Sequence, residues 1–324
     1  MVKLASAEMA EKKLATRAAF GATLAELAEE GVPVVAVDAD LTGSTTTKKF
    51  AAAAPENADK LFNCGIAEQN MIDVAAGLAL TGHVAYTGSF AVFGTGRAYD
   101  QIRNTVCYSN LDVKICPTHA GVSVGPDGGS HQMLEDVSLM RGLPNMRVLV
   151  PADYAAARAA IKLAAKTPGP VYVRMGRAAV PCVYDDDVEL ELGRAYVLRE
   201  GADATVVACG VEIREALAAA DALAAEGISI EVIDAFSVKP LDEDTITASV
   251  AKTGCCVVAE EHSVHGGLGS AVAECLARKN PAPCEFVGVQ DRFGKSGEFE
   301  ELLGYFNLDA AAIVEAVKRA MSRK

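Results

Sequence analysis

Short runs of β-branched residues alternate with longer helical stretches, and this alternation constrains the fold more than any other feature of the sequence. In the first half, strands are expected at 32–37, 83–87, 112–116, 147–150 and 171–174, and helices at 8–28, 67–80, 96–108 and 154–166. Strands that alternate with helices in this way are typical of a parallel sheet covered by helices on both faces. The first half is therefore predicted to be a doubly wound α/β domain.

A change in composition marks the end of this unit. The segment 181–193 contains Asp185-Asp186-Asp187 and further acidic residues, which favours a solvated linker. After it, strands are expected at 204–208, 228–233, 255–260 and 284–289, with helices at 212–225 and following Gly269. We predict a first domain over residues 1–183, an acidic linker over 184–194, and a second, smaller α/β domain over 195–324.

Charge and cysteine content narrow the possible partners and location. The 324 residues include 30 basic and 43 acidic side chains, a net charge of −13, which argues against a nucleic-acid or anionic membrane surface. The nine cysteines lie mostly in apolar, strand-like runs and are interpreted as buried residues of a reducing compartment. No apolar run reaches the ~20 residues of a membrane-spanning helix, so a cytoplasmic protein is expected.

Two phosphate-binding motifs common in α/β proteins are missing from the sequence. There is no GxxxxGK[ST] P-loop, and no GxGxxG lies between a strand and a helix. Open α/β sheets nevertheless bind ligands at the carboxyl ends of their strands. Polar residues are dense in those loops, at 38–44, 64–71, 87–93 and 117–132, so the functional site is expected there.

These loops carry a recognisable set of motifs. They read GIAEQN at 65–70, SFAVF at 89–93 and TH at 118–119, followed by DGG at 127–129 and by His131. In order and spacing, the motifs resemble the pyrimidine-binding module of the transketolase family. The second half, with EEHSVHGGLGSAVAE and DRFGKSGEF, is similar to that family's C-terminal domain. The resemblance implies a parallel-sheet module that binds the pyrimidine of thiamine diphosphate, followed by a smaller mixed-sheet α/β domain.

The resemblance implies that Glu68 is the catalytic carboxyl of the cofactor site. Thiamine diphosphate reacts through a carbanion on its thiazolium ring, and its own aminopyrimidine removes the proton as the imino tautomer. A carboxyl that is hydrogen-bonded to the pyrimidine nitrogen favours this tautomer. Phe90 and Phe93 are expected to pack on the pyrimidine, and Asp40 and Ile66 are the other expected cofactor contacts.

The resemblance also implies a channel for a sugar phosphate. The residues that match its phosphate end are Arg17, Ser44, His119 and either Arg177 or Arg174, because the local alignment leaves the last choice open. Arginine suits phosphate because it forms paired, charge-assisted hydrogen bonds. Asp127 and His131 match residues that contact the hydroxyls of the donor ketose, and His131 is also a candidate for proton transfer.

Each of these residues alone has an ordinary structural explanation. A glutamate at a helix start is commonly just a favourable partner of the helix dipole, so the order of the motifs carries the prediction. One position departs from the family pattern: Gly96 stands where another aromatic is expected, three residues after Phe93. His262 and His265 have no evident third ligand, so no metal site is expected on this chain.

A family motif that binds Mg²⁺ and the diphosphate is not found. The sequence has no GDG with an asparagine some thirty residues later, so these ligands are expected on a separate N-terminal subunit. The predicted protein is one subunit of an α2β2 transketolase that transfers a two-carbon ketol unit between sugar phosphates, by default those of the pentose phosphate pathway. The alternatives are a β-like subunit of a 2-oxoacid dehydrogenase, a deoxyxylulose-phosphate synthase-like subunit and a non-catalytic subunit.

Overall fold

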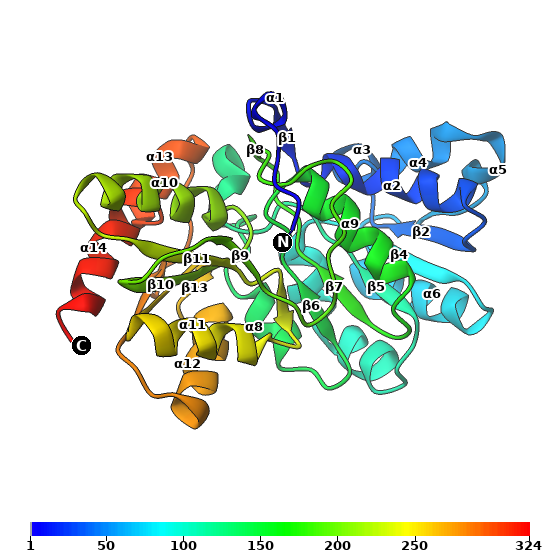
Figure 1. Ribbon diagram of the computed structural model, residues 1–324. Coiled ribbons are helices and arrows are strands. Elements are labelled where there is room, and N and C mark those ends of the chain that lie inside the picture. Colours follow the sequence, from blue (N-terminus) through cyan, green and yellow to red (C-terminus); the bar gives the residue numbers. More distant parts are fainter. Residues whose placement is uncertain (1) are drawn as a thin grey trace.

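Two α/β units lie side by side in the computed structural model, which describes residues 2–324 (Figure 1). The first unit contains a seven-stranded sheet with the order β12-β6-β7-β5-β4-β2-β3. Its strands are β2 (Val34–Asp38), β3 (Leu61–Asn63), β4 (Val84–Gly88), β5 (Val113–Ile115), β6 (Arg147–Leu149), β7 (Val171–Val173) and β12 (Ser237–Lys239). All neighbours pair in parallel except β12 and β6. The predicted parallel, doubly wound sheet is therefore confirmed for the strands of the first half.

Helices cover both faces of this sheet. Along β2, even-numbered residues pack in one apolar core and odd-numbered residues in another, because side chains alternate along a strand. The first core includes α2 (Ala18–Glu29) and α9 (Tyr154–Ala165), and the second includes α6 (Glu68–Leu80) and α8 (Asp136–Arg141). Burial on both faces explains the continuous apolar runs in these strands.

Shorter elements connect these strands and helices. They are α1 (Ala7–Ala10), β1 (Lys13–Ala15), α3 (Thr42–Thr45), α4 (Thr47–Ala53), α5 (Pro55–Ala58), the π-helix η1 (Val92–Arg97), α7 (Tyr99–Gln101), the π-helix η2 (Ile102–Cys107), the 3₁₀ segment η3 (Val122–Asp127) and β8 (Ala179–Pro181). The stretch predicted as one helix at 96–108 instead contains the end of η1, which begins at Val92, followed by α7 and η2.

The second unit is smaller and contains a five-stranded sheet with the order β14-β13-β10-β11-β9. Its elements are β9 (Tyr196–Arg199), β10 (Ala204–Ala208), α10 (Glu212–Ala225), β11 (Ile230–Asp234), α11 (Glu243–Thr253), β13 (Cys256–Ser263), α12 (Leu268–Lys279), β14 (Cys284–Val289), α13 (Phe299–Phe306) and α14 (Ala310–Met321). Only β9 is antiparallel to its neighbour, so the predicted mixed sheet is confirmed.

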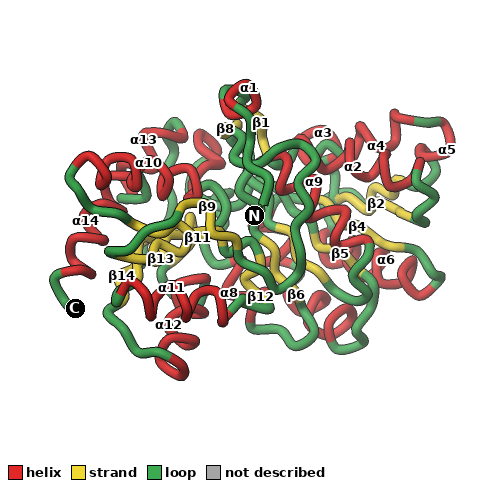
Figure 2. The backbone as a smooth tube through the Cα atoms, viewed as in Figure 1, coloured by secondary structure: helices red, strands yellow, loops and turns green. Residues whose placement is uncertain are grey.

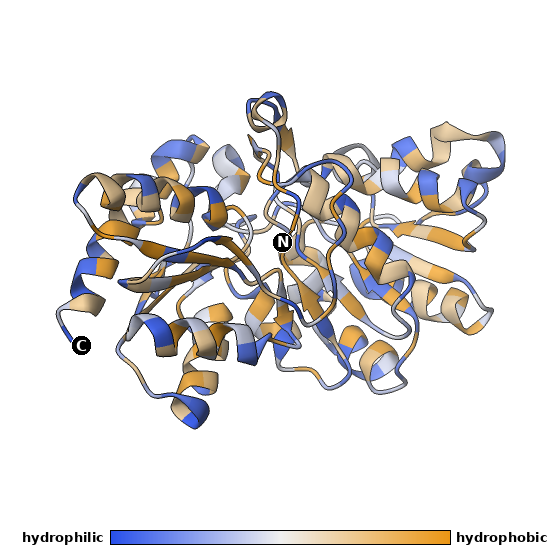
Figure 3. Cartoon of the chain, in the orientation of Figure 1, coloured by the Kyte–Doolittle hydropathy of each residue, from blue (hydrophilic) through white to orange (hydrophobic). Residues whose placement is uncertain are grey.

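The two units share a sheet and both cores. Strand β12 belongs to the second half of the sequence but pairs with β6 of the first, with Ser237 opposite Leu149 (Figure 2). Each of the two large apolar cores contains residues from both halves. Figure 3 shows apolar residues concentrated along the strands of both sheets. The units therefore pack as one body.

Two local expectations were wrong. The helix predicted at 8–28 is interrupted by β1, which pairs antiparallel with β8 and leaves α2 to begin at Ala18. The acidic segment after β8 is not simply a solvated linker, because Tyr184 is fully buried and its hydroxyl donates to Asp234 at 2.6 Å. In both cases, pairing with a distant segment outweighs the local pattern. No helix among residues 2–324 is long and apolar enough to cross a membrane.

Candidate active site

The loop after β2 is held in place by a buried aspartate. Oδ1 of Asp38 accepts a hydrogen bond from the Leu41 amide at 2.7 Å, and Oδ2 accepts from the hydroxyls of Thr45 and Thr47 at 2.7 and 2.9 Å. Burial raises the pKa of this carboxyl, and the hydrogen bonds oppose that shift. Asp40 follows with a left-handed backbone (φ 65°) and an exposed side chain. The loop therefore presents Asp40 at the carboxyl edge of the sheet.

Glu68 is the first residue of α6, and its side chain is only 2% exposed. Its Oε2 accepts a hydrogen bond from Nη1 of Arg97 at 2.8 Å. Ile66 lies two residues earlier and is 79% exposed. The structure thus buries the predicted catalytic carboxyl in an ion pair, whereas the side chain of Ile66 projects into solvent.

Four of the predicted site residues form one aromatic cluster. The rings of Phe90 and His119 stack with centroids 3.8 Å apart, and those of Phe90 and Phe93 lie 6.2 Å apart at an interplanar angle of 15°. The ring centroids of His131 and Phe93 lie 5.4 Å apart, with the two ring planes at 78° to each other. Phe90 and His119 are buried, whereas Phe93 and His131 are half-buried. Loops that follow β4 and β5 therefore bring together residues up to about forty positions apart in sequence.

His119 occupies an unusual backbone and electrostatic position. Its φ is 62°, in a region that non-glycine residues seldom adopt and that is often found at functional sites. The hydroxyl of Thr118 lies 2.7 Å from its Nδ1. Burial, together with the nearby positive charges of Arg17 and Arg177, lowers the pKa of His119 to about 3. The imidazole is therefore neutral near pH 7.

A cleft of about 380 Å³ opens between the two arginines of the predicted phosphate end. Its lining includes Arg17, Ser123, Arg177, Glu298 and Phe299. Nη1 of Arg17 donates to the Ser44 carbonyl, and Nη1 of Arg177 donates to the Val124 carbonyl, both at 2.8 Å. Burial, with Arg177 nearby, lowers the pKa of Arg17. Two partly buried guanidinium groups that face one cleft favour an anionic ligand.

Arg174 lies elsewhere. It is buried, and its guanidinium donates to both carboxylate oxygens of Asp136, at 2.7 and 3.2 Å, and to the Glu261 carbonyl at 2.9 Å. Of the two arginines that the alignment left open, only Arg177 lines the cleft. Arg174 joins the two units instead.

Asp127 and His131 lie at the two ends of a short turn that follows η3. The side chain of Asp127 is exposed, and Nδ1 of His131 lies 3.0 Å from the hydroxyl of Ser130. Gln132, the next residue, is buried, and its Nε2 donates to the carbonyl oxygens of Val122 at 3.1 Å and Lys295 at 2.9 Å. A residue of the second unit thus holds the loop that carries both predicted ketose contacts.

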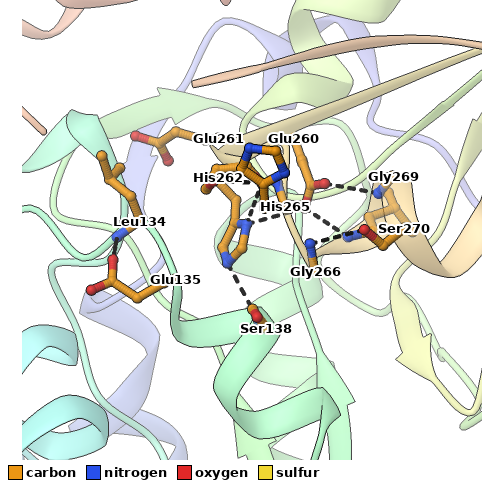
Figure 4. A network of polar contacts seen from close by, with 12 residues as sticks. Leu134, Glu135, Ser138, Glu260, Glu261, His262, His265, Gly266, Gly269 and Ser270 are labelled. Carbon is orange, nitrogen blue, oxygen red and sulfur yellow. Dashed lines mark hydrogen bonds and ion pairs between the residues drawn. The ribbon is translucent and has the colours of Figure 1, made fainter. Parts of the chain in front are cut away.

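Three consecutive polar residues of strand β13 accept hydrogen bonds from main-chain amides, and two of them, Glu261 and His262, reach the first unit (Figure 4). Glu260 accepts hydrogen bonds from the amides of Leu268 and Gly269 at the start of α12. Glu261 accepts from the amide of Ser123, and Nε2 of His262 accepts from the amide of Ser138 in α8 at 3.3 Å. The role of His262 in this structure is therefore to satisfy a helix amide. Among residues 2–324, no group of three or more His, Cys, Asp and Glu side chains is arranged to hold a metal ion.

Sequence reasoning missed three residues of this region. Arg97, Gln132 and Glu261 all contact the predicted site or the loop that carries it. The only signal for Arg97 was its place beside Gly96, the position that departs from the family pattern. Gln132 directly follows His131 in the motif, but no feature of the sequence indicated its contact with a segment more than 160 residues away.

Two family models match the chain, and together they cover most of it. The pyrimidine-binding domain of transketolase matches residues 12–183, and the C-terminal domain of transketolase matches residues 193–313. The chain belongs to the transketolase family. The family and the fold that the motifs of the first half predicted are thus confirmed.

Relatives within the transketolase family match nearly the whole chain. A Methanocaldococcus jannaschii protein described as a transketolase C-terminal section is 44% identical over 311 residues, 95% of this chain and 96% of that protein. The 6-deoxy-6-sulfo-D-fructose transketolase subunit SqwH of Clostridium sp. (strain MSTE9) is 42% identical, covering 93% and 92%. A solved split-gene transketolase, described as an inactive β4 tetramer, is 49% identical, with a TM-score of 0.87 over 96% of this chain and 99% of that chain.

Proposed function

We propose that the chain is the C-terminal subunit of a split transketolase that transfers a two-carbon ketol unit from a ketose phosphate to an aldose phosphate. The observation that carries the proposal is the buried carboxyl of Glu68 at the strand ends that also hold the stacked rings of Phe90 and Phe93. The relatives described as transketolase sections and subunits support it.

These residues fit the aminopyrimidine of thiamine diphosphate. An aromatic face offers area and geometry to a planar ring, and a buried carboxyl can hydrogen-bond a ring nitrogen. When bound, the cofactor supplies the nucleophile and stabilises the negative charge on the transferred two-carbon unit. In this proposal Glu68 holds the pyrimidine nitrogen, Phe90 and Phe93 orient the ring, and Asp40 is a further contact at the same sheet edge.

The cleft between Arg17 and Arg177 is the proposed phosphate end of the substrate channel. Two guanidinium groups and the neutral imidazole of His119 can each donate hydrogen bonds to phosphate oxygens. Asp127 and His131 are proposed to bind the hydroxyls of the donor ketose, and His131 to move a proton at the reacting carbon. The main-chain contact of Arg17 with Ser44 orients that guanidinium.

A second chain is proposed to supply Mg²⁺ and the ligands of the diphosphate, in an α2β2 assembly. This proposal rests on the pairing of pyrimidine and diphosphate modules that the family resemblance implies. The solved relative described as an inactive β4 tetramer supports it, because a complex built from one type of half-site is expected to lack activity.

The test compares three preparations: the chain alone, a GDG-containing N-terminal transketolase subunit encoded by the same genome alone, and both together. Each is assayed with thiamine diphosphate, Mg²⁺ and a panel of ketose and aldose phosphates. Ketol transfer is expected only in the mixture. Full activity of the isolated chain would refute the split-enzyme proposal, and turnover of pyruvate without ketol transfer would favour a 2-oxoacid dehydrogenase relative.

A further inference from the structure

One cation, Arg97, lies directly in the candidate cofactor site, beside Glu68 and Phe93. Arg97 ends the π-helix η1 and donates from Nη1 to Oε2 of Glu68 at 2.8 Å. Its guanidinium carbon lies 4.4 Å from the centroid of the Phe93 ring. Among the described residues, Arg97 is the one hydrogen-bond partner of the Glu68 carboxyl. The same side chain therefore contacts both groups that are proposed to bind the aminopyrimidine.

The π-helical backbone explains why residue 97, rather than residue 96, reaches this position. A π-helix closes its hydrogen bonds from i to i+5 and so holds more residues in each turn than an α-helix. The residue that returns to the side of Phe93 is then the fourth after it, Arg97, rather than the third, Gly96. Gly96 is exposed. An aromatic at position 96 would point away from Phe93, and the guanidinium of Arg97 fills the place beside that ring.

Arg97 is also fixed through its main chain. Nε2 of Gln69 donates to the Arg97 carbonyl at 3.3 Å, and Gln69 directly follows Glu68 in α6. Side-chain and main-chain contacts thus join the start of α6 to the end of η1. Because one carboxylate oxygen of Glu68 is held by Arg97, the carboxyl has a defined orientation, and its other oxygen remains for a ligand.

We infer that Arg97 positions the Glu68 carboxyl and that its guanidinium forms one wall of the aminopyrimidine pocket, beside Glu68 and Phe93. This inference rests on the proposed function. A charge-assisted hydrogen bond has a stricter geometry than packing alone, and the planar guanidinium can stack on Phe93 while it donates in its own plane. No other described residue combines both contacts.

The test measures cofactor binding in the complex with the N-terminal subunit, by titration calorimetry with thiamine diphosphate in the presence of Mg²⁺. Arg97→Ala is expected to weaken binding about tenfold, as the loss of one charge-assisted hydrogen bond implies. Arg97→Met keeps the packing on Phe93 but donates no hydrogen bond, so it should be as defective as Arg97→Ala. Arg97→Lys keeps a charged donor and should recover most of the affinity.

A second readout is the near-ultraviolet circular dichroism of the bound cofactor, which reports its imino tautomer. At saturating cofactor, the imino signal should fall in the Ala and Met variants and return with Lys. Arg103→Ala is the matched control, because Arg103 lies in the adjacent π-helix and donates only to its neighbour Asn104. Equal or tighter binding by Arg97→Ala, or full recovery by Arg97→Met, would overturn the inference. A wild-type complex that binds no thiamine diphosphate would instead overturn the proposed function.

Discussion

At the scale of single residues, the candidate site controls charge by burial. His119 is the clearest case, because burial and two neighbouring arginines lower its pKa to about 3. The proposed phosphate end therefore combines the two cations Arg17 and Arg177 with a neutral hydrogen-bonding ring. The buried carboxyl of Glu68 is instead paired with the guanidinium of Arg97.

The first prediction concerns Glu68. Glu68→Gln keeps the shape of the side chain but removes the carboxyl, so the rate of ketol transfer should fall about 10²- to 10⁴-fold, the usual contribution of a proton-transfer group. The rate is measured on the assembled complex at saturating cofactor. Glu56→Gln is the matched control, because Glu56 also lies in the first turn of a helix but is exposed. If both variants kept full activity, Glu68 would be only a partner of the helix dipole.

The second prediction concerns pH and Asp234. Burial raises the pKa of this carboxyl to about 7, and its Oδ1 has no hydrogen-bond partner among the described residues. The folded protein therefore holds a proton that the unfolded chain releases near pH 4, so this group's contribution to stability falls as pH rises from about 4 to about 7.

Asp234→Asn should remove this pH-dependent loss of stability, because the amide does not ionise. Its side-chain oxygen can still accept the hydrogen bond from the hydroxyl of Tyr184. We expect the variant to be more stable than the wild type above pH 7. The difference in their free energies of unfolding should decrease towards pH 4. Each unit of pKa difference corresponds to about 1.4 kcal/mol, so the gain should be at most a few kcal/mol. Urea unfolding at several pH values measures it, and a constant difference between pH 4 and 8 would contradict the assignment.

At the scale of elements, the second unit holds the loop that carries Asp127 and His131. Gln132 donates to the Lys295 carbonyl, and the two backbones nearly touch, since a Cβ on Gly129 would lie 2.6 Å from the Gly294 carbonyl oxygen. At the other end of the loop, Glu261 accepts from the Ser123 amide. The C-terminal domain thus fixes both ends of a segment that belongs to the pyrimidine-binding domain.

The third prediction tests this contact. Gln132→Ala should lower kcat/KM for the sugar phosphates about 10- to 100-fold, because small displacements of substrate-binding groups are costly. The affinity for thiamine diphosphate should not change. Lys295→Ala is the control, because it keeps the backbone carbonyl and removes only a side chain that lies over Tyr305. A loss of cofactor affinity in Gln132→Ala would show a general disturbance rather than a positioning effect.

At the scale of the whole molecule, the two units are one cooperative structure. Strand β12 completes the sheet of the first unit, and a buried network of Arg174, Asp136 and Glu261 joins the units. Asp136 keeps its charge in this setting, because the neighbouring Arg174 overcomes the effect of burial and lowers its pKa. A single unfolding transition is therefore expected.

The fourth prediction follows from this network. Arg174→Ala leaves the carboxylate of Asp136 buried without its cation, which should cost about 3–5 kcal/mol and separate the unfolding of the two units in calorimetry. Arg177→Ala is the contrast: it should change stability by less than about 0.5 kcal/mol but raise KM for phosphorylated substrates. Equal effects of the two substitutions on stability would contradict the different roles given to these arginines.

The spacing of apolar residues predicted the strands and helices well where a segment follows either the strand or the helix periodicity throughout. The helices predicted at 67–80 and 212–225 and the strand at 284–289 match the structure within a residue or two. The prediction failed where contact with a distant segment determines the local structure. Strand β1 forms because it pairs with β8, and Tyr184 of the acidic segment is buried because it contacts Asp234.

The sequence by itself determined the family and the alternating fold, and it indicated the loops that carry the candidate site, because these depend on short motifs and local periodicity. Only the tertiary structure decided that Arg177 rather than Arg174 lines the cleft, that Arg97 reaches Glu68, and that Gln132 is held by Lys295. Those contacts join residues between 29 and 163 positions apart. Burial, charge and distance at such separations are properties of the packed chain, so no local pattern can encode them.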